Sequence, residues 1–186
     1  MKKFSFHFNL IDEDDERIPH GNLTYIVAFL IPLIMFIALY YVREIYPFGD
    51  NCYLRSDMYH QYAPFFKELW RKLAHGESLS YSWDIGMGTN FTALYAYYLA
   101  SPVNWLIVLF PQKYIIEIMN AIIIIKASLA SVAFTYYISR HFNNKSCTIA
   151  LFGMFYGMSG FIAAYSWNIM WLDCIVMLPL VMLGLE

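Results

Sequence analysis

The chain has 186 residues, of which 60% are hydrophobic and 14% are charged, and its mean hydropathy is +0.47. Soluble domains are about 45–50% apolar and about 25% charged, so this composition indicates an integral membrane protein. The formal net charge of −2 argues against a nucleic-acid partner, because such a partner requires a basic face.

The N-terminal region divides into a polar tail and one apolar segment. Residues 1–22 are polar, with an acidic run at positions 12–16, and are predicted to form a solvated cytoplasmic tail. Residues 23–42 supply the roughly 20 apolar residues that a membrane-spanning helix needs. They do not resemble a signal peptide, because the preceding leader is long and acidic and no small-x-small cleavage site follows.

Residues 43–93 form a long polar loop, in which residues 57–75 are predicted to be an amphipathic helix. Its apolar residues follow the i, i+4, i+7, i+8 spacing of one face: Met58, Tyr62, Phe65, Phe66, Leu69, Trp70 and Leu73. The opposite face carries Asp57, His60, Gln61, Lys67, Glu68 and Arg71. Pro64 predicts a kink in this helix, and Gly76 predicts its C-terminal end. Such a helix is expected to lie in the membrane interface, although a brace for the bundle would explain the same face.

Residues 94–186 are predicted to form a transmembrane helical bundle. Its apolar segments are 94–110, 114–138, 147–165 and 169–185. The first is short and is interrupted at Ser101-Pro102 and Asn104. The fold class is therefore all-α and multi-pass, with four spans and a doubtful fifth. Because the chain stops at the margin of a helix, we expect it to be the N-terminal part of a longer protein.

The orientation depends on segment 94–110. If the N-terminus is cytoplasmic and every segment spans, the loop 139–146, with Arg140 and Lys145, lies outside, against the positive-inside rule. A re-entrant or half-spanning 94–110 removes this conflict. We therefore favour a cytoplasmic N-terminus and an external 43–93 loop.

The external loop carries candidate catalytic residues. Asp57, His60 and Gln61 would share one face of a helical turn. A carboxylate held at the outer membrane surface is what a general base needs to act on a lipid-borne substrate. Ordinary capping beside Ser56 would also explain an aspartate there. Asp50, seven residues earlier, is the rival acid.

Other polar residues are candidates for substrate binding. Trp83 and Asp84 are typical of a sugar-binding aromatic with a polar partner, although an interfacial tryptophan is the simpler explanation. The Gly86-x-Gly88 pair with Asn90 would offer backbone donors to a phosphate, but two loop glycines usually form only a turn.

Two charges lie within the predicted spans. Lys126, near the middle of its span, would either neutralise a carrier phosphate or pair with an acid from a helix beyond this chain. Asp173 lies near the start of the last span, close to the outer face. Intramembrane ionisable residues are functional by default, so both are candidate binding residues.

Several blocks of the sequence resemble the YfhO-type bacterial membrane proteins. They are DMYHQY-x-PFF, YSWDIGMGTN, YYLASP, YGMSGF and WLD with the following LPL, and the likeness covers roughly residues 23–186. The resemblance implies the N-terminal portion of a GT-C type glycosyltransferase in the bacterial cell membrane. Such an enzyme takes a sugar from a polyprenyl-phosphate carrier and transfers it to a cell-envelope polymer such as lipoteichoic acid.

The resemblance also assigns roles to residues. Asp57 matches the acid of the first external loop and would be the general base, with His60 and Gln61 orienting it or the donor sugar. The family's chains are several times longer, so this chain alone is expected to be inactive. No paired-acid ligand set is visible and the three cysteines are scattered, so no metal or other cofactor is predicted. A transporter or flippase of lipid-linked substrates, or a non-catalytic assembly protein, remain alternatives.

Overall fold

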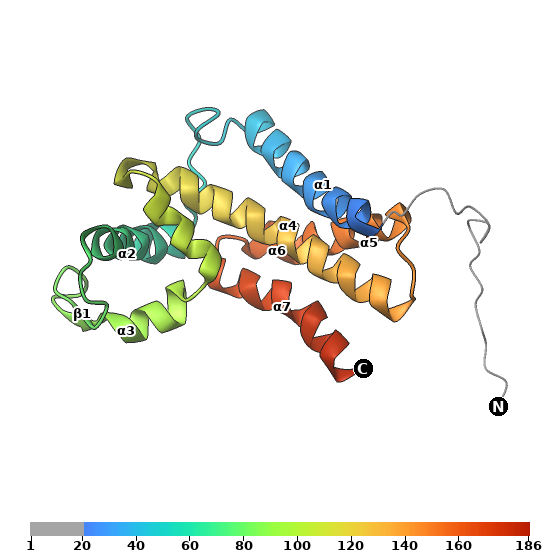
Figure 1. Cartoon of the computed structure of the whole chain (residues 1–186). Helices are drawn as coiled ribbons and strands as arrows, with labels where there is room; N and C mark the ends of the chain where they lie inside the picture. Colours follow the sequence, from blue (N-terminus) through green and yellow to red (C-terminus); the bar gives the residue numbers. More distant parts are fainter. Residues whose placement is uncertain (1–20) are drawn as a thin grey trace.

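The computed structural model describes residues 21–186, which are mostly helical (Figure 1). The longer helices are α1 (Gly21–Val42), α2 (Ala63–His75), α4 (Ile115–His141), α5 (Cys147–Gly157) and α7 (Ile169–Leu185). The short elements are η1 (Met58–Tyr62), β1 (Tyr81–Ser82), β2 (Thr89–Asn90), α3 (Phe91–Leu94), η2 (Tyr95–Leu99), η3 (Pro102–Leu109), η4 (Gln112–Tyr114) and α6 (Gly160–Tyr165). The all-α bundle is confirmed, whereas nearly all of the predicted tail over 1–22 lies outside the described residues.

Among residues 21–186, three helices are long and apolar enough to cross a membrane: Asn22–Val42, Gln112–His141 and Cys147–Tyr165. A bent pair of short helices, Phe91–Leu99 and Pro102–Leu109, would make a fourth span if it crosses. The predicted span 169–185 corresponds to α7, which is apolar but has only 17 residues. At 1.5 Å per residue α7 is about 26 Å long, slightly less than the roughly 30 Å hydrocarbon core.

Helix α4 is the centre of the bundle and contacts α1, α5 and α7. Two of its buried hydroxyls are satisfied within the helix: Ser128 donates to the carbonyl of Ile124 at 2.9 Å, and Thr135 donates to that of Ser131 at 2.8 Å. Helix α5 lies against α4 through Gly153 and Gly157. A Cβ atom on Gly157 would lie 2.7 Å from the Ala127 carbonyl oxygen, so only glycine fits this crossing.

Helices α1 and α4 run antiparallel. The Thr24 hydroxyl, at the start of α1, donates to the carbonyl of Lys145 at 2.7 Å, just beyond the end of α4. At the other end, the Asn120 amide donates to the carbonyl of Tyr46 at 3.3 Å. The start of α1 and the basic turn after α4 therefore share one end of the bundle, which agrees with a bent pair that returns to the side it came from.

The bent pair turns through 107° between Leu99 and Pro102. Ser101 is extended, with φ −119° and ψ 134°, because the following proline disfavours helical backbone at the residue before it. The interruption predicted from Ser101-Pro102 is therefore present, and it divides segment 94–110 into two short helices.

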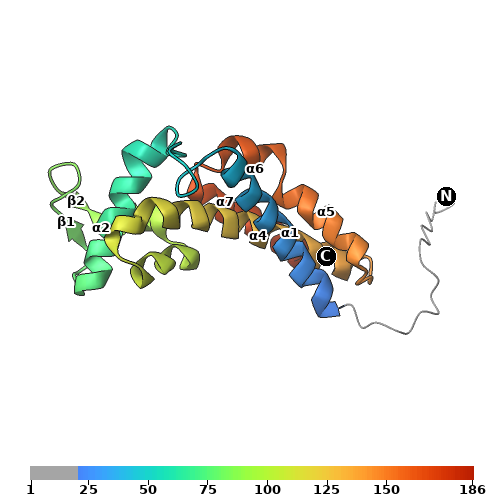
Figure 2. The same cartoon turned by 90° about the horizontal axis from the view of Figure 1, so that it is seen from above.

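The loop over residues 43–93 folds as a brace against the bundle. Figures 1 and 2 show α2 and the β1–β2 hairpin at one end of the elongated molecule and α5 toward the other. The apolar face is covered by protein, and Met58, Tyr62, Phe66 and Leu69 are each 0% exposed. A π-helical turn, η1, precedes the kink expected at Pro64, and Gly76 ends α2 with a left-handed φ of 66°.

One prediction for the polar face of α2 is wrong. Glu68 was expected on the solvent side, but its side chain is 5% exposed. The hairpin folds over this position, and the Ser82 hydroxyl of β1 donates to Glu68 Oε1 at 2.6 Å. Two strands of two residues each leave too short a pattern to be recognised in the sequence.

Candidate functional site

Asp57 lies immediately before η1 and is half-buried, whereas the neighbouring His60 is exposed. Within residues 21–186, no hydrogen bond or ion pair joins Asp57 to His60 or Gln61. The ring of His60 instead makes an edge contact with Tyr59, with centroids 5.1 Å apart. The common face predicted from α-helical spacing is altered because a π-turn bonds i to i+5. The rival acid Asp50 is exposed in the loop before η1.

Tyr62 connects η1 to the start of α7. Its hydroxyl donates to Asn168 Oδ1 and accepts from the backbone N–H of Met170, both at 3.4 Å. Burial raises the pKa of Tyr62 to about 12, and the nearby Asp57 carboxylate contributes to this rise. Tyr62 is therefore a neutral link between the turn that follows Asp57 and α7.

A second group of polar side chains joins three helical elements inside the bundle. The fully buried Lys126 ammonium of α4 donates to Asp173 Oδ2 of α7 at 2.7 Å and to the Ile169 carbonyl at 3.2 Å. The Ser101 hydroxyl, at the break in the bent pair, donates to Asp173 Oδ1 at 2.8 Å. The acid partner of Lys126 is thus within this chain, which corrects the expectation of a helix beyond it.

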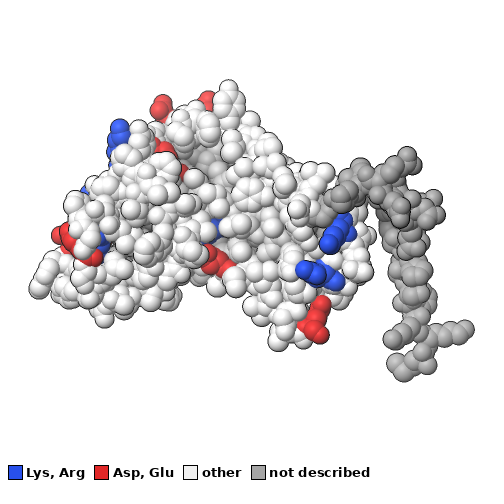
Figure 3. Space-filling model, in the orientation of Figure 1, with Lys and Arg blue, Asp and Glu red and all other residues white. Residues whose placement is uncertain are grey.

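Asp173 is open on one side. Its side chain is 36% exposed, although both carboxylate oxygens have partners. A carboxylate is costly in contact with lipid hydrocarbon, so we expect this side to face water or further protein. Figure 3 shows charged surface at the two ends and along the upper edge of the molecule, with one small charged patch in the middle of an otherwise white face.

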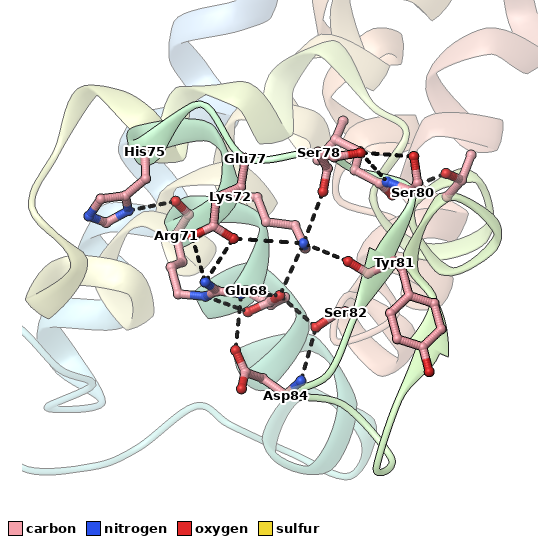
Figure 4. Close-up of polar contacts among 12 residues, drawn as sticks. Glu68, Arg71, Lys72, His75, Glu77, Ser78, Ser80, Tyr81, Ser82 and Asp84 are labelled. Atoms are coloured by element: carbon pink, nitrogen blue, oxygen red, sulfur yellow. Dashed lines mark hydrogen bonds and ion pairs between the residues drawn. The ribbon is translucent and has the colours of Figure 1, made fainter.

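A third group, in the 43–93 loop, is centred on Arg71 (Figure 4). Its guanidinium donates to both oxygens of Glu68, at 3.0 and 2.8 Å, and to Glu77 at 2.7 Å. It also forms an ion pair with Asp84 of the hairpin at 3.0 Å. Burial alone would raise the pKa of Glu68, but hydrogen bonds from Arg71 and Ser82 together with the charges of Arg71 and Lys72 lower it below its ordinary value.

Lys72 fixes the hairpin to α2. Its buried ammonium donates to the carbonyls of Ser78 at 3.0 Å and Tyr81 at 2.8 Å, as Figure 4 shows. It also lies over the ring of Phe91, 5.3 Å from the centroid. Sequence reasoning missed Lys72, because nothing in the helical pattern distinguishes it from its solvent-exposed neighbours.

The other predicted binding residues lie on or beside the hairpin. Trp83 is 76% exposed, with its ring in edge contact with that of Tyr81 at 4.8 Å. Asp84 belongs to the Arg71 network. Asn90 has a structural role, because its side chain accepts from the backbone N–H of Ala93 at 3.2 Å and caps α3. In the described part of the chain, no group of three His, Cys, Asp or Glu side chains is placed to hold a metal ion.

The helices and the buried polar group define a multi-pass integral membrane protein. Residues 28–186 match the family model described as bacterial membrane protein YfhO, and the chain belongs to this family. The family resides in bacterial membranes, as predicted. Searches of curated proteins and of solved structures gave no match.

Proposed function

We propose that this chain is the N-terminal portion of a membrane glycosyltransferase. It would transfer a sugar from a polyprenyl-phosphate donor to an extracytoplasmic cell-envelope polymer such as lipoteichoic acid. The observation that carries the proposal is the Asp57 carboxylate, which is half-buried immediately before η1, the turn whose Tyr62 bonds to the residues at the start of α7. Membership of the YfhO family and the GT-C resemblance of the external loop support it.

In this mechanism Asp57 acts as general base. It accepts the proton of an acceptor hydroxyl as that oxygen bonds to the sugar's anomeric carbon and the bond from this carbon to the carrier phosphate breaks. His60 and Gln61 would contact the donor sugar. Because Asp173 already balances the charge of Lys126, we assign this pair to holding the bent helices rather than to binding the carrier phosphate.

The topology follows from the same proposal. We assign the N-terminal tail and the basic turn after α4 to the cytoplasm, and the 43–93 loop to the outside. The bent pair is then re-entrant, and the shared end of α1 and the basic turn supports this assignment.

The test uses the complete protein in cells depleted of the native copy. Asp57→Asn, expressed at the membrane in equal amount, should lower sugar transfer to isolated envelope polymers by about 100-fold or more, because a general base contributes at least this much. Asp50→Asn serves as the matched control and should retain transfer. Full transfer with Asp57→Asn would remove Asp57 from catalysis.

Transport of a lipid-linked substrate is the second candidate. Discontinuous helices that meet intramembrane charges mark transport sites, and here the break at Ser101 meets Asp173 and Lys126. This function predicts that replacing Lys126 and Asp173 together abolishes activity while Asp57→Asn does not. A non-catalytic assembly role, which the buried face of α2 would serve, requires none of the three charges.

A further inference from the structure

A cavity of about 350 Å³ lies beside the Arg71 network, outside the group that contains Asp57. It is lined by Pro64, Lys67, Glu68 and Arg71 of α2, by Asp84 and Ile85 of the hairpin and by Gln112 of η4. Small-molecule sites begin at about 300 Å³, so this cavity has room for one small polar group.

The residues around the cavity divide into bonded and unbonded groups. Arg71 is shared among three carboxylates, and both oxygens of Glu68 accept hydrogen bonds. Within residues 21–186, by contrast, Lys67 and the Gln112 side chain make no hydrogen bond or ion pair, and only one oxygen of Asp84 is used. The cavity therefore offers an ammonium, an amide and a carboxylate oxygen on walls that the Arg71 network holds in place.

The lining is electrically balanced. The cations Lys67 and Arg71 face the carboxylates Glu68 and Asp84. A phosphate entering the cavity would meet both carboxylates, with only Lys67 free to neutralise it. A neutral ligand rich in hydroxyls meets no such repulsion and satisfies donors and acceptors alike.

We propose that this cavity binds a single neutral saccharide unit through Lys67, Asp84 and Gln112. Lys67 follows Asp57 by ten residues, across the π-turn and Pro64. The cavity is therefore lined by other residues than the turn that carries Asp57, and its assignment to a saccharide rests on the proposed function.

The experiment measures binding without turnover. The complete protein in lipid nanodiscs is titrated with methyl glucoside, methyl galactoside and methyl N-acetylglucosaminide, and saturation-transfer NMR reports each ligand. Gln112→Ala and Asp84→Asn should each weaken binding about tenfold, as expected for one lost hydrogen bond to or from a polar site. The matched controls are Lys113→Ala, the exposed neighbour of Gln112, and Glu44→Gln, an exposed acid of the same loop.

Two results would overturn the proposal. One is the absence of saccharide binding to the wild type, or binding that Gln112→Ala and Asp84→Asn leave unchanged. The other is binding of glycerol 3-phosphate alone, lost in Lys67→Ala, which would make the cavity an anion site. The outcome is separable from that of the proposed function, because Asp57→Asn should abolish transfer and leave saccharide binding intact.

Discussion

Lys126 and Arg71 are both held by carboxylates, but in opposite surroundings. Lys126 is 0% exposed and has one acid, Asp173, within a bundle of apolar helices. Arg71 is 34% exposed and is shared among Glu68, Glu77 and Asp84 at the end of the molecule that carries the hairpin. The Lys126–Asp173 contact is expected to stabilise the protein more than any one of the Arg71 contacts, because Lys126 is buried, whereas water can replace a lost partner of the partly exposed Arg71.

The two regions also constrain different parts of the chain. The Lys126 contact joins α4, α7 and the break in the bent pair, which are distant in sequence. The Arg71 contacts join α2 to a hairpin that follows it directly. Loss of the Lys126 contact should therefore loosen the bundle, and loss of the Arg71 contacts only the 43–93 loop.

The largest effect should come from Lys126→Met, which leaves the Asp173 carboxylate without a cation. Removing one partner of a buried ion pair lowers the free energy of unfolding by about 3–5 kcal/mol. Because Asp173 is partly exposed, we expect a loss of about 2 kcal/mol. This loss would be measured as a lower unfolding temperature of the complete protein in detergent. Lys113→Met, at an exposed lysine, is the control, and the double variant Lys126→Met/Asp173→Leu should recover part of the loss. An unchanged unfolding temperature in Lys126→Met would contradict the expectation that the Lys126–Asp173 contact stabilises the protein more than the Arg71 contacts do.

Glu68→Gln should have a smaller and local effect. It removes charge-assisted bonds from Arg71 and weakens the contact with Ser82, at an expected cost of about 1 kcal/mol. Hydrogen exchange followed by mass spectrometry should show faster exchange in residues 78–90 and unchanged exchange in α4. Faster exchange throughout the bundle would mean that the two regions are not independent.

The same carboxylate predicts a pH dependence. Because the folded state lowers the pKa of Glu68, its stabilisation is fully present above the ordinary glutamate pKa of about 4.3 and is lost as the pH falls through the lower folded value. The difference in unfolding temperature between wild type and Glu68→Gln should be constant from about pH 7 to 5 and shrink below about pH 4. A difference that persists at low pH would exclude ionised Glu68 as its source.

The smallest effect should come from Glu77→Gln. Glu77 is 39% exposed, and exposed ion pairs contribute about 0–1 kcal/mol, so we expect less than about 0.5 kcal/mol. The exchange rate of residues 78–90 should barely change and should be insensitive to added salt. A loss of stability as large as that caused by Glu68→Gln would show that the exposure of a contact does not determine how strongly it stabilises the loop.

The sequence predicted features that depend on local chemistry. A spanning segment was expected over 23–42, and the helix α1 covers Gly21–Val42; the break at Ser101-Pro102 and the end of α2 at Gly76 were both expected. Features that depend on distant residues were missed. Lys126 and Asp173 are 47 positions apart, and the burial of Glu68 depends on a hairpin too short to show a pattern. The role of Asp57 stays a prediction.

The close crossing of α4 and α5 has a consequence for biosynthesis. The two helices are joined by only five residues, Phe142–Ser146, and meet where Gly153 and Gly157 leave no space for a side chain. During translation they can therefore enter the bilayer as one helical hairpin, already paired before α7 is made. Asp173 then reaches Lys126 on a preassembled surface, so that this lysine is without its acid partner only during synthesis.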